Sequence, residues 1–295
     1  IIDEFSKVGI YLFKSFLNAV GDETKLLFVG DWNQLPSVEP GFLLHDLVNS
    51  GKFHYFELSS THRQKKDSSI CINRDLILEG KTELKQDSHF VIKRFHNDSE
   101  VRMEAKRIFE TFYDPVNYQK LHIITPQQSG TIGVQGLNLL AQEIFHNAGE
   151  DHICYGEDCF YRSDKVMTVR NVYGDESYFN GNLWLVHDFC SEEMILSADD
   201  DTNVHIHEDH YEDIALAYAT TVHKYQGSEG EIIVIVLPSD VTPSMISRSI
   251  LYTAVTRAID KVIILSSENM LERFITADIH PQRNSGIVEK LEKIL

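Results

Sequence analysis

Several features are missing from this sequence, and their absence narrows what the chain is. No apolar run approaches the roughly 20 residues that span a bilayer, so we expect no contact with membranes. No phosphate-binding loop of the form Gly-x-x-x-x-Gly-Lys-Ser/Thr occurs in the 295 residues. Internal repeats and low-complexity tracts are also missing.

Cysteine is scarce. The chain has four cysteines, at positions 71, 154, 159 and 190, and none forms a Cys-x-x-Cys pair. We interpret them as free thiols in a reducing cytosol, which predicts a cytoplasmic protein. His152 lies near Cys154 and Cys159, but this spacing fits no common zinc site.

Basic residues are outnumbered. Lys and Arg total 27 against 45 Asp and Glu, which gives a net charge of −18. This balance argues against a protein that coats DNA through a basic surface. It allows a narrow basic groove, because binding follows local rather than total charge. Two acidic stretches, Glu192–Asp201 and Glu208–Asp213, are interpreted as a solvated loop and a solvated face.

Short apolar runs alternate with amphipathic helical patterns. Runs of strand length occur at Leu26–Val29, His122–Thr125, Ile232–Leu237 and Lys261–Leu265. Helical faces lie between them, around residues 12–20, 137–144 and 250–258. This alternation indicates an α/β fold with a parallel sheet covered on both faces. Residues 151–214 interrupt it with short alternating segments, which predict a small antiparallel β insertion.

The first segment with chemical content is Ile1-Ile-Asp-Glu4. Two apolar residues followed by two acids are typical of a buried strand that ends in a Walker B pair. In such a pair, the Asp holds Mg²⁺ and the adjacent Glu can activate water.

Two further segments place polar groups after apolar ones. In Leu27–Gly41, a strand is expected to end at Val29, so that Gln34 follows the carboxyl edge where α/β sheets bind ligands. Its amide could sense a γ-phosphate or the attacking water, although an ordinary turn would look the same. In Leu58–Gln64, Arg63 could be an arginine finger or a surface ion-pair partner.

The last two segments lie near the end of the chain. Ala217–Glu229 gathers polar side chains around a glycine turn before the apolar run at Ile232. Leu251–Ala258 is an apolar helix face with Arg257 at its end. A catalytic His in the first of them would have no Ser or Cys partner nearby.

Together, these five segments resemble the motifs of superfamily 1 helicases, most closely the RecD-like 5′→3′ branch. The motifs are matched, in order, by Ile1–Phe5 (II), Gly30–Gly41 (III), Leu58–Gln64 (IV), Ile123–Asn138 (IVa), Tyr218–Glu229 (V) and Leu251–Ala258 (VI). Lys165–Met167 with Phe179–Gly181 resembles the SH3-like insertion of the family. One departure is Arg162-Ser-Asp164, where the family usually has Gly-Asp.

The resemblance implies roles for individual residues around ATP. Asp3 would hold Mg²⁺, Glu4 would activate water and Gln34 would sense the γ-phosphate. Arg63 and Arg257 would contact that phosphate from the other lobe.

Motif V adds nucleotide and DNA contacts. Gly227 and Glu229 would bind the nucleotide, with Glu229 on the ribose. Thr221, His223 and Lys224 would touch the DNA strand. Bases could stack on exposed aromatic residues, for which the sequence offers Trp32, Tyr173 and Tyr225.

The resemblance also implies an organisation into RecA-like lobes. Residues 1–62 would end a first, partial lobe, residues 63–150 and 215–295 would form a complete second lobe, and residues 151–214 would form an SH3-like β-barrel insertion. The intact protein would be an ATP-dependent DNA helicase that uses Mg²⁺, moves on single-stranded DNA and engages single/double-strand junctions. Nuclease or recombination subunits are its candidate partners. Two alternatives remain: the helicase part of a conjugative relaxase or nuclease-associated protein, and an inactive lobe that serves as an interaction module.

We predict that these 295 residues alone do not hydrolyse ATP, because the Walker A backbone and Lys that cradle the β- and γ-phosphates are missing. The measurement is phosphate release with single-stranded DNA present, compared with a Glu4→Gln variant. A rate above that of the variant would contradict the prediction.

Overall fold

The computed structural model describes residues 1–58, 67–147, 149–174, 177–190, 192–199, 202–279 and 285–294. The chain forms two compact units, each of which gathers distant parts of the sequence. Unit 1 holds residues 1–85, 246–256 and 272–295, and unit 2 holds residues 86–245 and 257–271. Among the described residues, no helix is long and apolar enough to cross a membrane.

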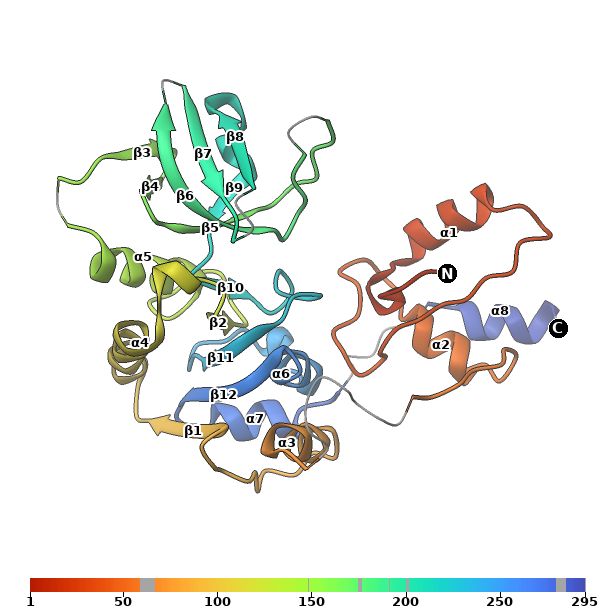
Figure 1. Cartoon of the computed structure of the whole chain (residues 1–295). Coiled ribbons are helices and arrows are strands. Elements are labelled where there is room, and N and C mark those ends of the chain that lie inside the picture. Colours follow the sequence, from red (N-terminus) through yellow and green to blue (C-terminus); the bar gives the residue numbers. More distant parts are fainter. Residues whose placement is uncertain are drawn as a thin grey trace. The chain divides into compact units, whose positions relative to one another are not determined.

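A five-stranded parallel sheet forms the centre of unit 2 (Figure 1). Its strands run in the order β1 (Phe90–Phe95), β12 (Ala258–Ser267), β11 (Gly230–Leu237), β2 (Leu121–Thr125) and β10 (Ala219–Thr221). The apolar runs form strands here because their side chains are buried on both faces, as the continuous pattern predicts. Helices α4 (Asp98–Phe112) and α5 (Val134–Phe145) pack over one face, and the α/β fold class is confirmed.

A separate antiparallel sheet also belongs to unit 2. Its order is β8 (Asn203–His207), β7 (Glu193–Ser197), β6 (Leu183–Cys190), β5 (Lys165–Thr168) and β9 (Ile214–Leu216). A hairpin of β3 (His152–Tyr155) and β4 (Asp158–Tyr161) precedes it. Both sheets contribute to one continuous apolar core. An antiparallel sheet is therefore present, whereas its SH3-like closure and the lobe boundaries remain predictions.

Asp164 joins the antiparallel sheet to the parallel one. The buried carboxylate accepts hydrogen bonds from four donors: Gln142 Nε2 at 2.7 Å, Tyr161 N at 2.8 Å, and His146 Nε2 and Tyr218 Oη at 2.9 Å. Gln142 lies on α5 and His146 directly follows it, Tyr161 ends β4, and Tyr218 precedes β10. Burial would lower the pKa of His146, but its bond to Asp164 raises that pKa above its usual value.

The next residue, Lys165, is also fully buried. Its Nζ donates to the carbonyl oxygen of Leu121 at 2.8 Å and lies 3.3 Å from Nδ1 of His122. Burial lowers the pKa of Lys165 to about 7. The start of β5 is therefore bonded directly to β2 of the parallel sheet.

Unit 1 is helical apart from one strand-like contact. It contains η1 (Phe5–Lys7), α1 (Ile10–Ala19), α2 (Leu43–Asn49), α3 (Ser69–Leu78), α6 (Arg248–Val255) and α8 (Ile287–Ile294). Helix α3 packs on α6, and α2 packs on α8. The remaining elements of the chain are η2 (Pro115–Asn117), η3 (Glu208–Asp213), η4 (Pro243–Met245) and α7 (Met270–Thr276).

The buried strands expected at Ile1–Ile2 and Leu26–Val29 are wrong. Ile2 and Phe28 form only an isolated parallel bridge, and Leu27 and Val29 are exposed. No further strand pairs with this bridge among the described residues, so the apolar run is not enclosed.

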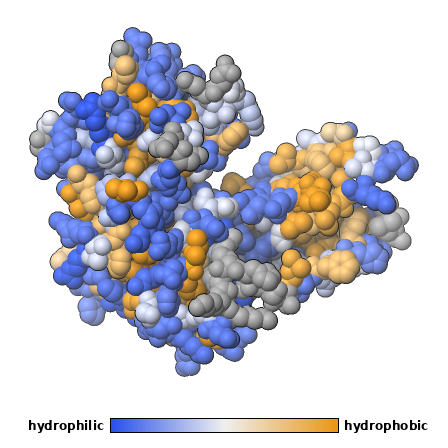
Figure 2. Space-filling view, viewed as in Figure 1, coloured by the Kyte–Doolittle hydropathy of each residue, from blue (hydrophilic) through white to orange (hydrophobic). Residues whose placement is uncertain are grey.

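An apolar surface therefore remains open on unit 1. Figure 2 shows apolar residues gathered over the unit that carries α1. The exposed residues of this apolar surface are Tyr11, Leu12 and Leu17 on α1, together with Leu26, Leu27 and Val29. Large exposed apolar patches mark interaction sites or a tendency to aggregate.

Ser163 precedes Asp164, at the position where the helicase family that this sequence resembles usually has Gly. Its φ of 68° lies in the left-handed region. We predict that Ser163→Gly raises the free energy of unfolding by about 0.5–1 kcal/mol, because Gly adopts this conformation without a Cβ clash. Urea unfolding measures the change. Ser163→Ala is the control, since it removes the hydroxyl but keeps the Cβ; an equal gain in both variants would contradict the explanation.

Candidate functional site

The acidic pair of the first segment lies at the end of the Ile2–Phe28 bridge. Ile2 N donates to Leu27 O, Val29 N to Ile2 O and Phe5 N to Val29 O, each at 2.8 Å. These bonds bring the loop after Val29 against the acidic segment, although neither segment forms a strand. Two distant parts of the sequence thus meet as expected for motifs II and III.

Asp3 and Glu4 follow this bridge. Asp3 is exposed, and its Oδ1 accepts the Glu4 N–H at 2.8 Å. Glu4 has a φ of 53°, an unusual conformation for a residue with a side chain. Strain of this kind is concentrated at functional sites. Lys7 Nζ lies 3.6 Å from Glu4 Oε2, which is a partly exposed pair.

Gly30 is required by close packing against this segment. A Cβ on Gly30 would lie 2.9 Å from Ser6 N and 3.2 Å from Phe5 N. A residue with a Cβ would fit here only if one of the two backbone segments moved. The Gly30-Asp31 pair of motif III therefore starts in contact with the end of the acidic segment.

Asp31 organises the turn that follows. Its Oδ1 accepts Asn33 N–H at 2.9 Å, and its Oδ2 accepts Gln34 Nε2 at 3.2 Å. The same Oδ2 accepts the Tyr252 hydroxyl at 2.9 Å. Leu35 N donates to Thr253 Oγ1 at 2.9 Å. Helix α6, which carries most of motif VI, thus holds the turn of motif III in place.

One atom of this turn has no partner. Gln34 Oε1 is buried, and no described residue donates a hydrogen bond to it. Leaving a buried acceptor unsatisfied costs about 1–3 kcal/mol. A water or another polar donor would satisfy it, as the sensing role of Gln34 requires.

The motif V residues form a tight turn after β10. Thr221 Oγ1 accepts Lys224 N–H at 3.3 Å, and Tyr225 N donates to Thr221 O at 3.1 Å. His223 and Lys224 are exposed, as a DNA contact requires. Gly227 has a φ of 90°, which a side chain rarely adopts, and Glu229 is exposed just before β11.

Tyr225 corrects one sequence expectation. It is completely buried, stacks on His122 with ring centroids 3.8 Å apart, and donates its hydroxyl to Glu229 O. Tyr225 therefore cannot stack on a base. Tyr173 is exposed, and Trp32 is half-buried against Tyr55, so both stay candidates for stacking.

Arg257 lies at the same turn. It is almost fully buried, its Nη1 donates to Ser228 O at 3.2 Å, and its carbonyl accepts Gly230 N–H at 3.0 Å. Arg257, near the end of motif VI, thus meets motif V within unit 2. Its finger role stays a prediction.

The candidate residues are divided between the units. Asp3, Glu4 and Gln34 belong to unit 1, whereas the motif V residues and Arg257 belong to unit 2. Arg63 lies outside the described residues.

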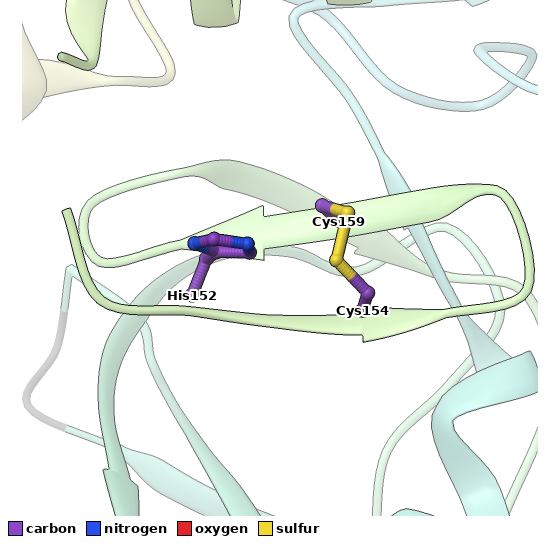
Figure 3. A group of neighbouring side chains, drawn as sticks. All are labelled: His152, Cys154 and Cys159. Carbon is purple, nitrogen blue, oxygen red and sulfur yellow. A yellow bond between two sulfur atoms is a disulfide. The ribbon is translucent and has the colours of Figure 1, made fainter. Parts of the chain in front are cut away.

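The prediction that all four cysteines are thiols is wrong for two of them. Cys154 and Cys159 are opposite each other in the β3–β4 hairpin and form a disulfide, beside His152 (Figure 3). Because their sulfurs are bonded to each other, they are not available as metal ligands in this state. Cys71 and Cys190 form no disulfide among the residues that the structure describes. The hairpin register, which the sequence hinted at only through Gly156 between the two cysteines, places them together.

Comparisons with known proteins agree with the motif order. Residues 1–100 match the model of an AAA domain, and residues 216–265 match that of a UvrD-like helicase C-terminal domain. The chain is 31% identical to the ATP-dependent RecD2 DNA helicase of Deinococcus radiodurans, over 99% of the chain and 39% of the relative. It is 24% identical to the RecBCD enzyme subunit RecD of Haemophilus influenzae, over 100% of the chain and 54% of the relative.

Solved structures give the fold. A Bacteroides Pif1 helicase in complex with ADP-AlF3 and single-stranded DNA aligns with a TM-score of 0.58 at 16% identity, covering 99% of this chain and 74% of that one. The chain thus spans about half or less of the length of the curated relatives named above.

We predict that Arg257→Lys lowers the free energy of unfolding by about 1–3 kcal/mol, because Ser228 O loses a buried charged donor with fixed geometry. Thermal and urea unfolding measure the loss. Arg162→Lys is the control, because the Arg162 side chain is half exposed and pairs with Asp188 at the surface. Unchanged stability of the Arg257 variant would mean that Ser228 does not hold the guanidinium.

Proposed function

We propose that this chain is the part of an ATP-dependent DNA helicase of the RecD-like group of superfamily 1 that carries motifs II to VI. The observation that carries the proposal is the unpartnered Gln34 oxygen, on a turn packed against the Asp3–Glu4 segment. A buried acceptor on the turn that follows Gly30, which itself packs against Phe5 and Ser6 next to the acidic pair, suits the oriented water of phosphoryl transfer. An inert module has no chemical use for this arrangement.

The residues present fit Mg²⁺ and a nucleotide. Asp3 offers an exposed carboxylate, the hard oxygen ligand that Mg²⁺ prefers. Bound Mg²⁺–ATP would supply the phosphoryl group that reacts with water. Glu4 would accept the proton of that water, and Gln34 Oε1 would accept its other hydrogen and so orient it. Arg257 and Arg63 would provide positive charge for the phosphoryl oxygens.

DNA would be bound through motif V. The exposed side chains of His223 and Lys224, next to Thr221, suit contacts to phosphates rather than to base edges. We propose binding to single strands and to single/double-strand junctions, with movement in the 5′→3′ direction and a place in recombination or repair. Few basic groups are involved, so affinity should fall only shallowly with salt. Nuclease or recombination subunits are the proposed partners.

The test is Glu4→Gln in the intact protein. ATP binding should persist while DNA-stimulated turnover falls by about 10²–10⁴-fold, because the amide keeps the shape but cannot accept a proton. ATP affinity and phosphate release are measured side by side. Glu23→Gln, at an exposed site of the same unit, is the matched control and should leave turnover unchanged.

Turnover near that of the wild type in Glu4→Gln would remove Glu4 from the mechanism. The direction of movement along DNA is tested by unwinding duplexes that carry either a 5′ or a 3′ single-stranded tail. Unwinding only from 3′ tails would contradict the proposed branch, and absence of ATP hydrolysis by the wild type would favour an interaction module.

A further inference from the structure

We propose that Asp31 and Tyr252 are positioning residues that fix which end of the Gln34 amide faces the reacting water. The inference rests on the proposed function and deepens it. It assigns to two residues outside the nucleotide contacts the task of setting the hydrogen-bonding direction of the sensor.

The orientation of Gln34 follows from the chemistry of its partner. The two ends of an amide have nearly the same shape, so packing alone does not distinguish oxygen from nitrogen. A carboxylate accepts hydrogen bonds and donates none. The end of the Gln34 amide next to Asp31 Oδ2 must therefore be the nitrogen, at 3.2 Å. The oxygen consequently points the other way.

The free end is an acceptor in a buried place. Gln34 Oε1 has no donor among the described residues. A water about to attack a phosphoryl group has two hydrogens to place, and a general base takes only one of them. An acceptor at Oε1 would hold the second hydrogen. With the amide reversed, its N–H₂ group would face the water and would repel both hydrogens.

Tyr252 holds Asp31 in this role. Its hydroxyl donates to the same Oδ2 at 2.9 Å, and Tyr252 is buried on α6. Burial, followed by the charge of Asp31, raises the pKa of the Tyr252 hydroxyl, so that it stays a donor. The neighbouring Thr253 accepts Leu35 N–H. Two consecutive residues of α6 thus fasten both ends of the sensor turn.

The experiment uses the intact protein and Tyr252→Phe. We expect kcat for ATP to fall about tenfold while the KM for ATP changes less than twofold, since the ring still packs and only the hold on Asp31 is lost. Tyr178→Phe is the matched control. Its hydroxyl also donates to a buried carboxylate, that of Asp213 at 2.9 Å, but in unit 2, where Tyr178 lies between β5 and β6 and Asp213 ends η3. It should lower stability without changing kcat.

A double-mutant cycle separates positioning from general loss of structure. In a Gln34→Ala background, Tyr252→Phe should have no further effect on kcat, because there is no amide left to orient. An equal tenfold loss in that background would overturn the inference. Asp31→Asn is a second variant should Tyr252→Phe fold poorly; Asn can face the Gln34 amide with either end, so kcat should fall and the same cycle should again show coupling.

The outcomes separate this inference from the proposed function. A wild-type protein that hydrolyses ATP, with Tyr252→Phe and Asp31→Asn equal to it, would overturn the positioning role and leave the helicase proposal standing. A wild-type protein without ATP hydrolysis would remove both.

Discussion

The attachment of the antiparallel sheet depends on one buried carboxylate. Asp164 takes hydrogen bonds from α5, from the β3–β4 hairpin and from the start of β10, and it has no solvent to replace them. A buried charge is tolerated only when its hydrogen-bonding capacity is met, so these elements must meet at one place. Lys165 reinforces the junction by bonding to the carbonyl of Leu121 on β2. Because Tyr218 and β10 begin motif V, the position of the motif V turn and that of the antiparallel sheet are set by the same group.

Asp31 works by the same physical rule in unit 1. Each carboxylate accepts several donors and offers none, so each imposes a direction on its neighbours. At Asp164, four donors must point at one carboxylate, and this allows a single packing of the elements that carry them. At Asp31, the Gln34 amide must present its nitrogen, and this allows a single orientation of the amide. A neutral polar residue in either place would allow more than one arrangement.

The sequence was sufficient wherever local pattern and burial agree. Continuous apolar runs predicted β2, β11 and β12, and the helical faces predicted α5 and α6. The helical pattern also predicted α1, although none of its residues is buried. The run at Leu26–Val29 misled because a strand needs a partner over several residues, and the described partner of this run is a single bridge to Ile2. Tyr225 was misassigned because nothing local distinguishes a buried Tyr from an exposed one. The Asp31–Tyr252 hydrogen bond could not be predicted from the sequence, because it joins residues 221 positions apart. The Cys154–Cys159 pairing depended on a hairpin register that the sequence left open.

The apolar surface on α1 and residues 26–29 has a practical consequence for handling the chain. Apolar side chains that meet water in a dilute preparation will meet one another in a concentrated one, and association through such patches rises with concentration. The chain's strong negative charge opposes this at low ionic strength, and added salt weakens the opposition. Self-association of the chain should therefore increase as salt is raised. A polypeptide that covers this apolar surface should keep the chain in solution.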